Sequence, residues 1–503
     1  MQTPIKSIVV VGGGTAGWMT ATALARVLNN EHFRIRLIES EQIGTVGVGE
    51  ATIPAIHDFN RRMGIDEQAF MRATNATFKL GIEFVNWQQI GSSYMHPFGT
   101  YGQDLNGVGF HHYWLKRKLA GDDTPFDEFS LPYVAAKMGR FKHPLDDPRS
   151  VYSSYSYAFH FDASLYAGFL RGIAEKLGVE RIEGKVVDVH LQPENGFIAD
   201  VVMENGDIID GELFIDCSGF RGLLIEEALH TGYDDWRNWL PCDSALAVPT
   251  ENEGEPPPFT RATAHRAGWQ WRIPLQHRTG NGHVYSSAYM SQDEATDILL
   301  QNVTGAAQAE PRLLRFTPGK RLQMWNRNCI AIGLSGGFLE PLESTSIFLI
   351  QAAIMKLIEF FPDAEFAEAD IDTYNRSMDR MFDEVRNFII LHYKATQRDD
   401  SKFWDYCREM SVPDELDYRM KLFRARGVAS HRHNELFIET NWLAVLLGQG
   451  IQPSQYDPRA DTIPAEQMTQ RLNSMHEYLR NAAAALPSHQ QAINDYCKSG
   501  AST

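Results

Sequence analysis

The sequence has little cysteine, no excess of positive charge and no long uninterrupted hydrophobic run. Its five cysteines are scattered over 503 residues, which is unlike a disulfide framework, and none forms the CxxC pair of a metal site. We therefore expect a reduced protein that holds no metal. Acidic residues number 64 against 47 basic ones, a formal net charge of −17. Nucleic acids and anionic membranes attract the opposite charge, so we expect neither as a partner.

Two further absences concern targeting. Residues 1–7 lack the basic start, the apolar core and the cleavage site of a secretory signal. The most apolar stretch, residues 347–361, is interrupted by Gln351 and Lys356 and is too short to span a bilayer. From these absences we expect a soluble, cytoplasmic protein.

The N-terminal residues have the pattern of a strand, a glycine-rich turn, a helix and a second strand. Residues 8–11 form an apolar run typical of a strand buried on both faces. Gly12, Gly14 and Gly17 follow in GxGxxG spacing and precede an Ala- and Leu-rich stretch, for which we predict a helix over residues 18–28. Residues 33–38 predict the next strand. This order predicts a dinucleotide-binding βαβ unit.

The residue types in this unit suit a dinucleotide. The first glycine permits a tight turn, the second lets the backbone approach a pyrophosphate, and the third lets the helix pack on the strand. N–H groups at the helix start, at Thr15 and Ala16, favour phosphates. Glu39, 22 residues after Gly17, would accept hydrogen bonds from ribose hydroxyls and would repel a 2′-phosphate. This favours FAD or NAD over NADP. The alternative is a glycine-rich turn without a ligand.

Later segments extend the same fold. We predict a helix over residues 159–177 and strands over residues 181–191, 197–203, 213–217 and 329–333. Asp216 begins an acid–small–small–glycine turn that resembles the second nucleotide loop of FAD monooxygenase-like folds, which favours FAD over NAD. Further candidate cofactor contacts are Ala51, Val186, Gly333 and Leu334.

Two other stretches complete the organisation. The glycine-dense segment over residues 44–54 would wrap a flavin as a strap or would simply connect its neighbours. From about residue 363 the pattern is mostly helical, including a long amphipathic stretch over residues 374–397. We therefore predict an α/β fold, with a FAD monooxygenase-like, Rossmann-type module and interleaved substrate-side insertions over residues 1–362. A mainly helical subdomain over residues 363–503 would pack on the substrate side.

A tryptophan-rich motif points to a family. Trp269, Trp271, Ile273 and Pro274 form the pattern WxWxIP. With GxGxxG, MHPFG at residues 95–99, FLEPLEST at residues 338–345 and LHYK at residues 391–394, the sequence resembles the flavin-dependent halogenases, especially the tryptophan halogenases. The resemblance implies that reduced FAD and O2 convert chloride or bromide into hypohalous acid, which passes through a tunnel to a lysine. It also implies a small aromatic substrate and a separate flavin reductase that supplies FADH2, and it leaves a homodimer open.

Two residues match the family's catalytic positions. Lys79 matches the lysine, which would hold hypohalous acid by a hydrogen bond or become a haloamine and so fix the halogen's position. From the alternation of residues 78–85 alone, Lys79 could also be a surface residue or a partner of Glu83. Glu343 matches the glutamate that stabilises positive charge on the ring and removes its proton. The alternative for Glu343 is an acid favoured at a helix start.

The resemblance places the halide at the start of a predicted helix over residues 344–361. Its backbone N–H groups at Thr345 and Ser346 would face the anion. The family commonly has glycine where Ser346 stands. A side chain there changes the size and polarity of the halide pocket, which bears on the choice between chloride and bromide.

The remaining candidates shape the substrate side. By the resemblance, Trp269 and Trp271 separate the organic substrate from the flavin; the alternative is two core aromatics. His96 and Phe98 line the substrate pocket, although His96 alone could cap a loop. The full set of substrate-side and tunnel candidates is His96, Pro97, Phe98, Trp269, Trp271, Ile273, Pro274, Ser344 and Trp442.

The C-terminal region departs from the tryptophan halogenases. That branch holds the amino and carboxylate groups of free tryptophan with a tyrosine pair, whereas this chain has Asn441, Trp442 and Leu443 at the matching place. Phe437, Trp442 and Leu446 would instead offer an aromatic floor. We therefore expect an indole or similar electron-rich arene without the amino-acid backbone, or a larger indole-bearing molecule.

Two other functions share part of this pattern. A flavin monooxygenase that hydroxylates an aromatic ring has the GxGxxG fold but needs neither Lys79 nor the WxWxIP motif. A non-catalytic flavoprotein needs only the nucleotide site.

Overall fold

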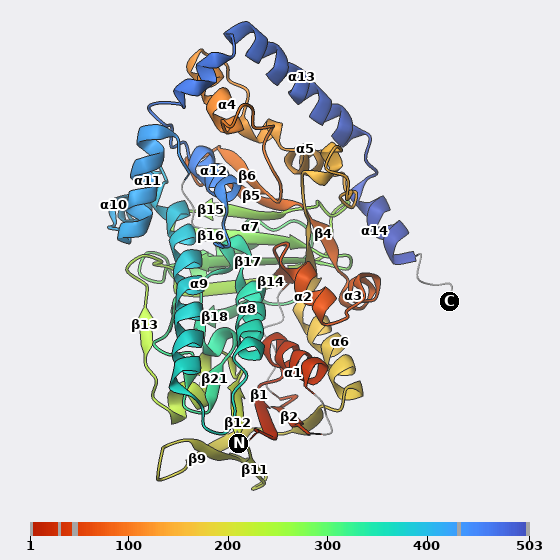
Figure 1. The fold of residues 1–503 in the computed structure, drawn as a ribbon, viewed down its shortest axis with the longest axis vertical. Coiled ribbons are helices and arrows are strands. Elements are labelled where there is room, and N and C mark those ends of the chain that lie inside the picture. The colour runs from red at the N-terminus through yellow and green to blue at the C-terminus, as the bar shows by residue number, and fades with distance from the viewer. Residues whose placement is uncertain (1–3, 29–31, 43–48, 430–433, 499–503) are drawn as a thin grey trace. The chain divides into compact units, whose positions relative to one another are not determined.

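The predicted parallel sheet is present and joins three separated stretches of the chain (Figure 1). The computed structural model describes residues 4–28, 32–42, 49–429 and 434–498. β1 (Ser7–Val11) lies between β2 (Arg34–Glu39) and β12 (Leu213–Asp216), and both pairings are parallel. The sheet has the order β20-β21-β12-β1-β2-β8. Its remaining members are β8 (Glu180–Glu183), β20 (Trp325–Asn326) and β21 (Cys329–Ala331). The prediction of an α/β fold is confirmed.

The first helix forms as its composition predicts. α1 (Thr15–Val27) begins three residues before the predicted start and buries a continuous stretch from Gly17 to Ala25. It packs against α6 (Ala163–Lys176) and α8 (Ser346–Glu359). Small residues on α1 allow these close contacts, because alanine and glycine keep helix axes near their neighbours.

The chain divides into two compact units, each assembled from three stretches. Unit 1 comprises residues 1–76, 161–237 and 315–383, and unit 2 comprises residues 77–160, 238–314 and 384–503. The predicted division into residues 1–362 and 363–503 follows a different line, since the helices after residue 384 belong to the same unit as a second sheet. The boundary falls within α9 (Glu368–Lys394).

Unit 1 contains further small elements around its sheet. Its other helices are α2 (Ile56–Arg62) and α3 (Glu67–Thr74). Its other strands are β3 (Gly49–Ala51), β9 (Val186–Leu191), β10 (Ile198–Met203), β11 (Ile208–Asp210), β13 (Tyr233–Asp235), β19 (Gly319–Arg321) and β22 (Gly337–Phe338). Residues 44–48 of the predicted flavin strap lie outside the described residues, and β3 covers part of the rest.

Unit 2 is built on a second, mostly antiparallel sheet with the order β18-β14-β17-β16-β15-β5-β6. The pairing of β15 with β5 is parallel and joins the middle of the chain to its N-terminal third. The strands are β5 (Gly81–Val85), β6 (Ser93–Pro97), β14 (Ser244–Thr250), β15 (Thr260–His265), β16 (Gly268–Pro274), β17 (Thr279–Tyr285) and β18 (Arg312–Arg315).

Helices of unit 2 cover this sheet and one another. α12 (Glu439–Gly448) packs on β6, and α13 (Ala465–Ala484) lies along α4 (Phe110–Leu119) and α5 (Leu131–Lys137) (Figure 1). The other helices are α7 (Gln292–Gln301), α10 (Lys402–Glu409), α11 (Asp414–Arg426) and α14 (His489–Lys498). The prediction of a mainly helical C-terminal region is confirmed.

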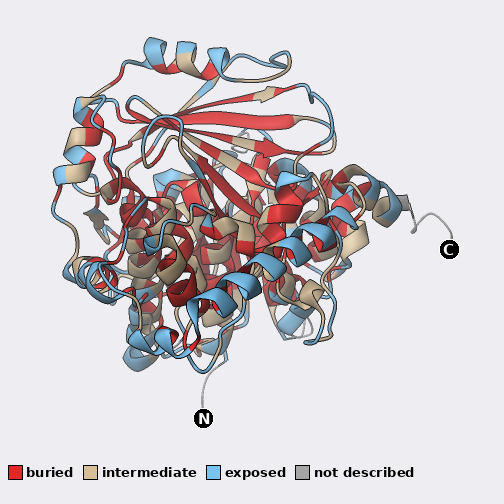
Figure 2. Cartoon of the chain, turned by 90° about the horizontal axis from the view of Figure 1, so that it is seen from above, coloured by how far each residue is buried: buried red, intermediate tan, exposed pale blue. Residues whose placement is uncertain are grey.

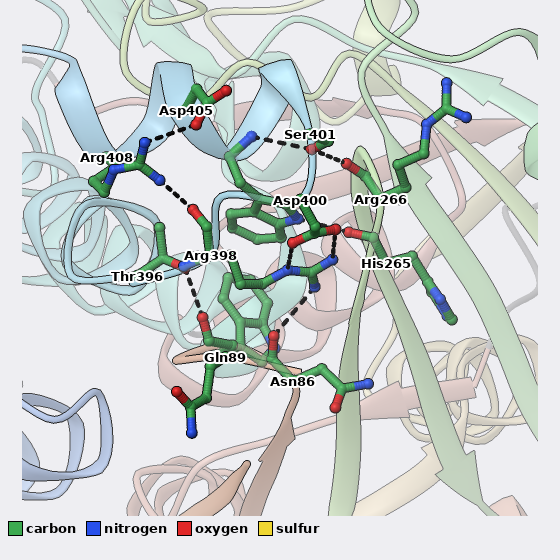
Figure 3. A network of polar contacts seen from close by, with 12 residues as sticks. Asn86, Gln89, His265, Arg266, Thr396, Arg398, Asp400, Ser401, Asp405 and Arg408 are labelled. Atoms are coloured by element: carbon green, nitrogen blue, oxygen red, sulfur yellow. Dashed lines mark hydrogen bonds and ion pairs between the residues drawn. The ribbon is translucent and has the colours of Figure 1, made fainter. Parts of the chain in front are cut away.

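Arg398 fixes the segment that follows α9 (Figure 3). Its guanidinium makes two hydrogen bonds to Asp400, of 2.7 and 2.8 Å, and donates a third to the carbonyl oxygen of Asn86 at 3.1 Å. It also lies over the ring of Trp404 at 4.7 Å. Arg408 in turn donates to the carbonyl oxygen of Arg398. These contacts hold the loop before α10 against the β5–β6 turn.

Buried residues concentrate in the strands and on the inner sides of the helices (Figure 2). The LHYK motif contributes to this core, because His392 is fully buried, stacks on Phe84 at 4.5 Å and accepts or donates a hydrogen bond with Tyr94 at 2.8 Å. No helix in the described part of the chain combines the length and the apolar character that a membrane crossing requires.

Three segments differ from the sequence predictions. The strand predicted over residues 181–191 is two strands, β8 and β9, which belong to different sheets. Of the helix predicted over residues 159–177, the first part is β7 (Ala158–Asp162), and the helix α6 begins at Ala163, where the Asp162 carboxylate accepts the N–H groups of Ser164 and Leu165. The strand predicted around Lys79 is two strands, β4 (Thr77–Lys79) and β5, because β4 pairs with β7 and β5 pairs with β6 and β15.

Candidate active site

The glycines of the GxGxxG turn are required by close backbone contacts in unit 1. Gly12 has φ of +116°, and a Cβ at this position would lie 2.2 Å from the carbonyl oxygen of Cys217. A Cβ at Gly17 would lie 1.8 Å from the carbonyl oxygen of Gly12. Both distances are far below van der Waals contact, so only glycine fits at either place.

Gly14 lies in open space instead. A Cβ there would meet no other atom within 4 Å. Gly14 is also the residue before α1, whose start at Thr15 and Ala16 has no side-chain cap and no acidic residue in its first turn. Bare N–H groups with room in front of them fit a pyrophosphate, so this turn can hold the phosphates of FAD.

Glu39 stands at the end of β2 as predicted and also makes contacts that the sequence did not reveal. Its carboxylate accepts hydrogen bonds from the Trp18 indole at 3.2 Å and from the Arg181 guanidinium at 2.6 Å. The hydrogen bond to Glu39 raises the pKa of Arg181. Arg181 therefore orients the Glu39 carboxylate, and the ribose contact of Glu39 stays a prediction.

Two predicted cofactor residues have clear structural roles in unit 1. The buried Asp216 carboxylate accepts the N–H groups of Ser218, Leu224 and Ile225 at 2.8 to 2.9 Å, so it shapes the loop after β12. Val186 packs in a hydrophobic cluster under the sheet. A direct contact of either residue with a cofactor stays a prediction.

A pocket in unit 1 joins predicted cofactor and halide residues. Gly333, Leu334 and Ser346 line it, together with apolar side chains that include Leu349 and Ile350. Gly333 has φ of +82°, and a Cβ there would lie 2.8 Å from the Cβ of Ala16, at the start of α1. The loop after β21 is therefore held close to the GxGxxG turn. Ala51 is buried on β3.

The PLEST motif forms a tight turn before α8. A 3-10 turn (Pro341–Glu343) leads into Ser344, which has φ of +59°, and the helix begins at Ser346, two residues after the predicted start. The Thr345 side chain makes no capping hydrogen bond. Glu343 is 1% exposed. Glu343 is thus a buried carboxylate just before a helix start that no side chain caps, and the catalytic and halide-binding roles stay predictions.

Lys79 is buried in unit 2. Its side chain is 0% exposed on β4, and its Nζ lies 5.1 Å from the centre of the Phe98 ring. The surface alternative is thereby excluded. The alternative partner Glu83 accepts from Lys137 at 2.7 Å and from Arg261 at 2.6 Å. Burial alone would raise the pKa of Glu83, but these two cations hold it below its usual value.

A network of buried hydrogen bonds supports the strand of Lys79. The Thr77 hydroxyl donates to the carbonyl oxygen of Pro274 at 2.7 Å, so its oxygen accepts from Nδ1–H of His160 at 2.9 Å. Nε2 of His160 then accepts from the Thr260 hydroxyl at 2.9 Å. Burial and, next, the charge of Lys79 hold the pKa of His160 well below its usual value, so this histidine is neutral. The network ties the WxWxIP strand to Lys79.

A second buried histidine supports the same strand. Nε2 of His489, the first residue of α14, accepts the N–H of Phe78 at 3.1 Å. Its Nδ1 donates to the carbonyl oxygen of Pro256 at 2.7 Å. Burial lowers the pKa of His489 to about 4, which keeps Nε2 free of a proton at neutral pH. α14 therefore supplies a hydrogen-bond acceptor to the backbone of β4.

The MHPFG motif runs beside Lys79. β5 and β6 approach closely at Gly81, where a Cβ would lie 2.5 Å from the carbonyl oxygen of His96. The N–H of Phe98 donates to the carbonyl oxygen of Leu80 at 2.8 Å. His96, Pro97 and Phe98 are all buried, and Phe98 lies next to Lys79 while Pro97 and His96 pair with Gly81 and Ile82.

The two tryptophans of WxWxIP lie on one face of β16. Trp269 and Trp271 are 1% and 5% exposed, and their ring centres are 6.2 Å apart. Trp271 lies over Gly282, where a Cβ would come within 2.0 Å of its indole ring. The indole N–H of Trp271 is buried and has no hydrogen-bond partner. Ile273 is buried further along the same strand.

The aromatic residues at the start of α12 pack on the end of α9. Phe437 stacks on Phe388 with ring centres 3.8 Å apart, and Trp442 contacts Phe388 edge to face at 5.1 Å. The Trp442 indole donates to the carbonyl oxygen of Phe437 at 3.1 Å, and Arg419 lies over its ring at 4.8 Å. Phe388 and Arg419 are contributions that the sequence reasoning missed, because neither stands in a recognisable motif.

The comparisons with known proteins agree with one another. Residues 7–465 match the family model described as tryptophan halogenase. Tryptophan 6-halogenase ThaL of Streptomyces albogriseolus is 38% identical over 449 residues, which cover 84% of this chain and 83% of ThaL. Among solved structures, a flavin-dependent halogenase from Xanthomonas campestris is 48% identical with a TM-score of 0.94, and the match covers 98% of this chain and 99% of that one.

A second solved structure is similar to the same extent. BrvH, a flavin-dependent halogenase from Brevundimonas sp. BAL3, is 46% identical with a TM-score of 0.94, over 98% of this chain and 99% of BrvH. These matches over nearly the whole chain confirm the predicted fold class and enzyme class. The chain is a flavin-dependent halogenase and belongs to the tryptophan halogenase family.

Proposed function

We propose that the protein halogenates an electron-rich, indole-type aromatic substrate through hypohalous acid delivered to Lys79. The observation that carries this proposal is the burial of Lys79, 0% exposed, with its Nζ 5.1 Å from the Phe98 ring, in a member of a halogenase family. A buried amine costs stability unless something offsets that cost, and a catalytic role would account for its burial.

The overall reaction balances in two steps. When bound, FAD would supply the redox chemistry: FADH2, O2, halide and one proton would give FAD, water and hypohalous acid. The aromatic C–H then becomes C–halogen, and hypohalous acid leaves as a second water. Lys79 holds the electrophilic halogen at one point, so the position attacked depends on how the ring is bound.

Other residues serve these steps. The backbone N–H groups of Thr345 and Ser346 would bind chloride or bromide, and Glu343 would accept the ring proton and stabilise the positive charge that precedes its loss. The turn of Gly12, Gly14 and Gly17 would hold the FAD pyrophosphate. Support comes from the uncapped starts of α1 and α8 and from the burial of Glu343.

The substrate proposal rests on the start of α12. Asn441 uses its carbonyl oxygen for the N–H of Ile438 at 2.8 Å, and its amide nitrogen faces His96 at 2.8 Å. The Trp442 indole N–H is taken by Phe437, and Leu443 has no polar group. These side chains would not clamp an ammonium and a carboxylate. An indole without the amino-acid backbone, or a larger indole-bearing molecule, fits them better than free tryptophan.

Reconstitution tests the proposal. The protein is supplied with FAD, NADH, a separate flavin reductase, O2 and either bromide or chloride, and products of indole and of free tryptophan are measured by mass. We expect halogenated indole to form with a higher kcat/KM than halogenated tryptophan. A higher kcat/KM for tryptophan would overturn the proposed substrate. A hydroxylated product without halogen would overturn the proposed reaction.

A further inference from the structure

The amide of Asn441 has a fixed orientation. Its Oδ1 accepts the backbone N–H of Ile438 at 2.8 Å, and a backbone N–H can only donate. The other end of the amide, Nδ2, must therefore be the atom that faces Nε2 of His96 at 2.8 Å. Because an amide NH2 only donates, Nε2 of His96 must accept. The backbone N–H of Ile438 therefore sets the direction of this hydrogen bond, and no assumption about the His96 ring protons is needed.

This direction determines the state of His96. A ring nitrogen that accepts carries no proton, so His96 is neutral and its proton is on Nδ1. Protonation of Nε2 would replace an attractive contact with two donors facing each other. Asp127, on the turn Phe126–Phe129, interacts electrostatically with His96, and burial raises the pKa of Asp127 to about 7. The charge of Glu128 raises the pKa of Asp127 further, and the charge of Lys137 lowers it.

His96 also occupies a particular place among aromatic rings. Its ring centre lies 6.4 Å from that of Phe98, 5.7 Å from Phe388 and 6.5 Å from Phe437. Phe98 in turn is the ring beside Nζ of Lys79 at 5.1 Å. A continuous series of contacts thus runs from the lysine through Phe98 and His96 to Asn441.

We propose that Asn441 is a positioning residue that locks His96 as the neutral Nδ1–H tautomer and fixes its ring plane as a wall for the aromatic substrate. This inference rests on the proposed function and adds a specificity determinant to it. The residue that interrupts the tyrosine pair of the tryptophan-binding relatives thereby acquires a role of its own. It acts through His96 and touches the substrate only by way of that ring.

The matched variant is Asn441→Asp. An aspartate keeps an oxygen that accepts the Ile438 N–H, so a purely structural role in α12 is preserved. Its second oxygen accepts where the amide donated, which requires a proton on Nε2 of His96. Asn195→Asp is the control: Asn195 is exposed in unit 1, its Oδ1 accepts the N–H of Phe197 at 2.9 Å, and the same charge is added.

Two measurements test the inference. Long-range 1H–15N spectra of protein labelled in histidine report which ring nitrogen is protonated, with the His96 signals identified by their loss in His96→Gln. We expect an unprotonated Nε2 in the wild type and in Asn195→Asp, and a protonated Nε2 in Asn441→Asp. We also expect KM for indole to rise roughly tenfold in Asn441→Asp, more than kcat falls, because substrate positioning is lost.

The outcomes separate the inference from the proposed function. A protonated Nε2 in the wild type, or an unchanged tautomer and KM in Asn441→Asp, would overturn the role of Asn441 whatever the enzyme halogenates. The expected tautomers without any halogenation of indole would instead retain the lock on His96 and overturn the proposed substrate.

Discussion

Replacement of Thr77 by valine removes one hydroxyl from behind Lys79 while keeping the shape of the side chain. That hydroxyl donates to the Pro274 carbonyl oxygen at 2.7 Å and accepts from His160 at 2.9 Å. Thr77, His160 and Thr260 are all buried, so water cannot replace the lost contacts. The change leaves one buried acceptor and one buried donor without a partner.

The expected cost follows from these two groups. An unsatisfied buried polar group costs roughly 1–3 kcal/mol, so two of them destabilise the protein by about 2–6 kcal/mol. Thr77→Ser is the matched control, because it keeps the hydroxyl and loses one methyl group, worth about 0.8 kcal/mol. Lys79, the proposed catalytic residue, lies two residues along the same strand, and small displacements of a catalytic group reduce rates strongly. We therefore expect halogenation by folded Thr77→Val to fall roughly tenfold or more.

Urea denaturation followed by tryptophan fluorescence measures the stability, and product formation per folded enzyme measures the rate. The reasoning predicts that Thr77→Val is clearly less stable than Thr77→Ser and that Thr77→Ser retains most of its activity. It would be refuted if Thr77→Val unfolded at the wild-type urea concentration, or if the serine variant lost as much stability as the valine variant.

Gly14→Ala should fold normally but bind FAD more weakly, whereas Gly17→Ala should unfold more easily, because only the Cβ at residue 17 meets the backbone, at 1.8 Å. Flavin fluorescence titration measures FAD binding and the urea midpoint measures stability; equal stability of the two variants would contradict the packing argument. Acid should destabilise unit 2, because burial lowers the pKa of His111, His283 and His489 to about 4. In the unfolded chain the pKa of histidine is about 6.5, so between that pH and about pH 4 only the unfolded chain takes up these protons. The free energy of unfolding therefore falls by about 2 kcal/mol per histidine between pH 6.5 and pH 5. Urea midpoints at pH 7 and pH 5 measure this loss, and a flat profile would contradict it.

The parts predicted correctly are those in which local sequence determines structure. Gly12 and Gly17 could be assigned because their backbone conformation and close contacts tolerate no side chain. The apolar run of β1 could be assigned because both faces of a central parallel strand are buried. The class of the fold follows from these local signals.

The environment of Lys79 could not be predicted in the same way. Residues 78–85 alternate as one strand would, yet the N–H of Leu80 donates to Pro258 and its carbonyl oxygen accepts from Phe98. Those partners are distant in sequence, and they split the segment between two sheets. The burial of Lys79 likewise depends on pairing with β7, whose residues read as the start of a helix when taken alone.

The division into two units could not be predicted from the sequence for a related reason. Each unit gathers three separated stretches, so no change in composition marks a boundary. At Asn441 the sequence indicated only that a tyrosine was missing. The amide contact with His96, 345 residues away, depends on the packing of α12 on β6.

The most direct test of the central claim is the yield of halogenated indole from Lys79→Met in the reconstituted reaction. Free methionine is added to consume hypohalous acid that escapes into solution, since a thioether is readily oxidised. FAD binding, measured in parallel, shows that the variant is folded. The account predicts a wild-type product that resists the scavenger and no such product from Lys79→Met, with FAD binding unchanged. Halogenation by Lys79→Met at the wild-type rate and ring position, with methionine present, would contradict it.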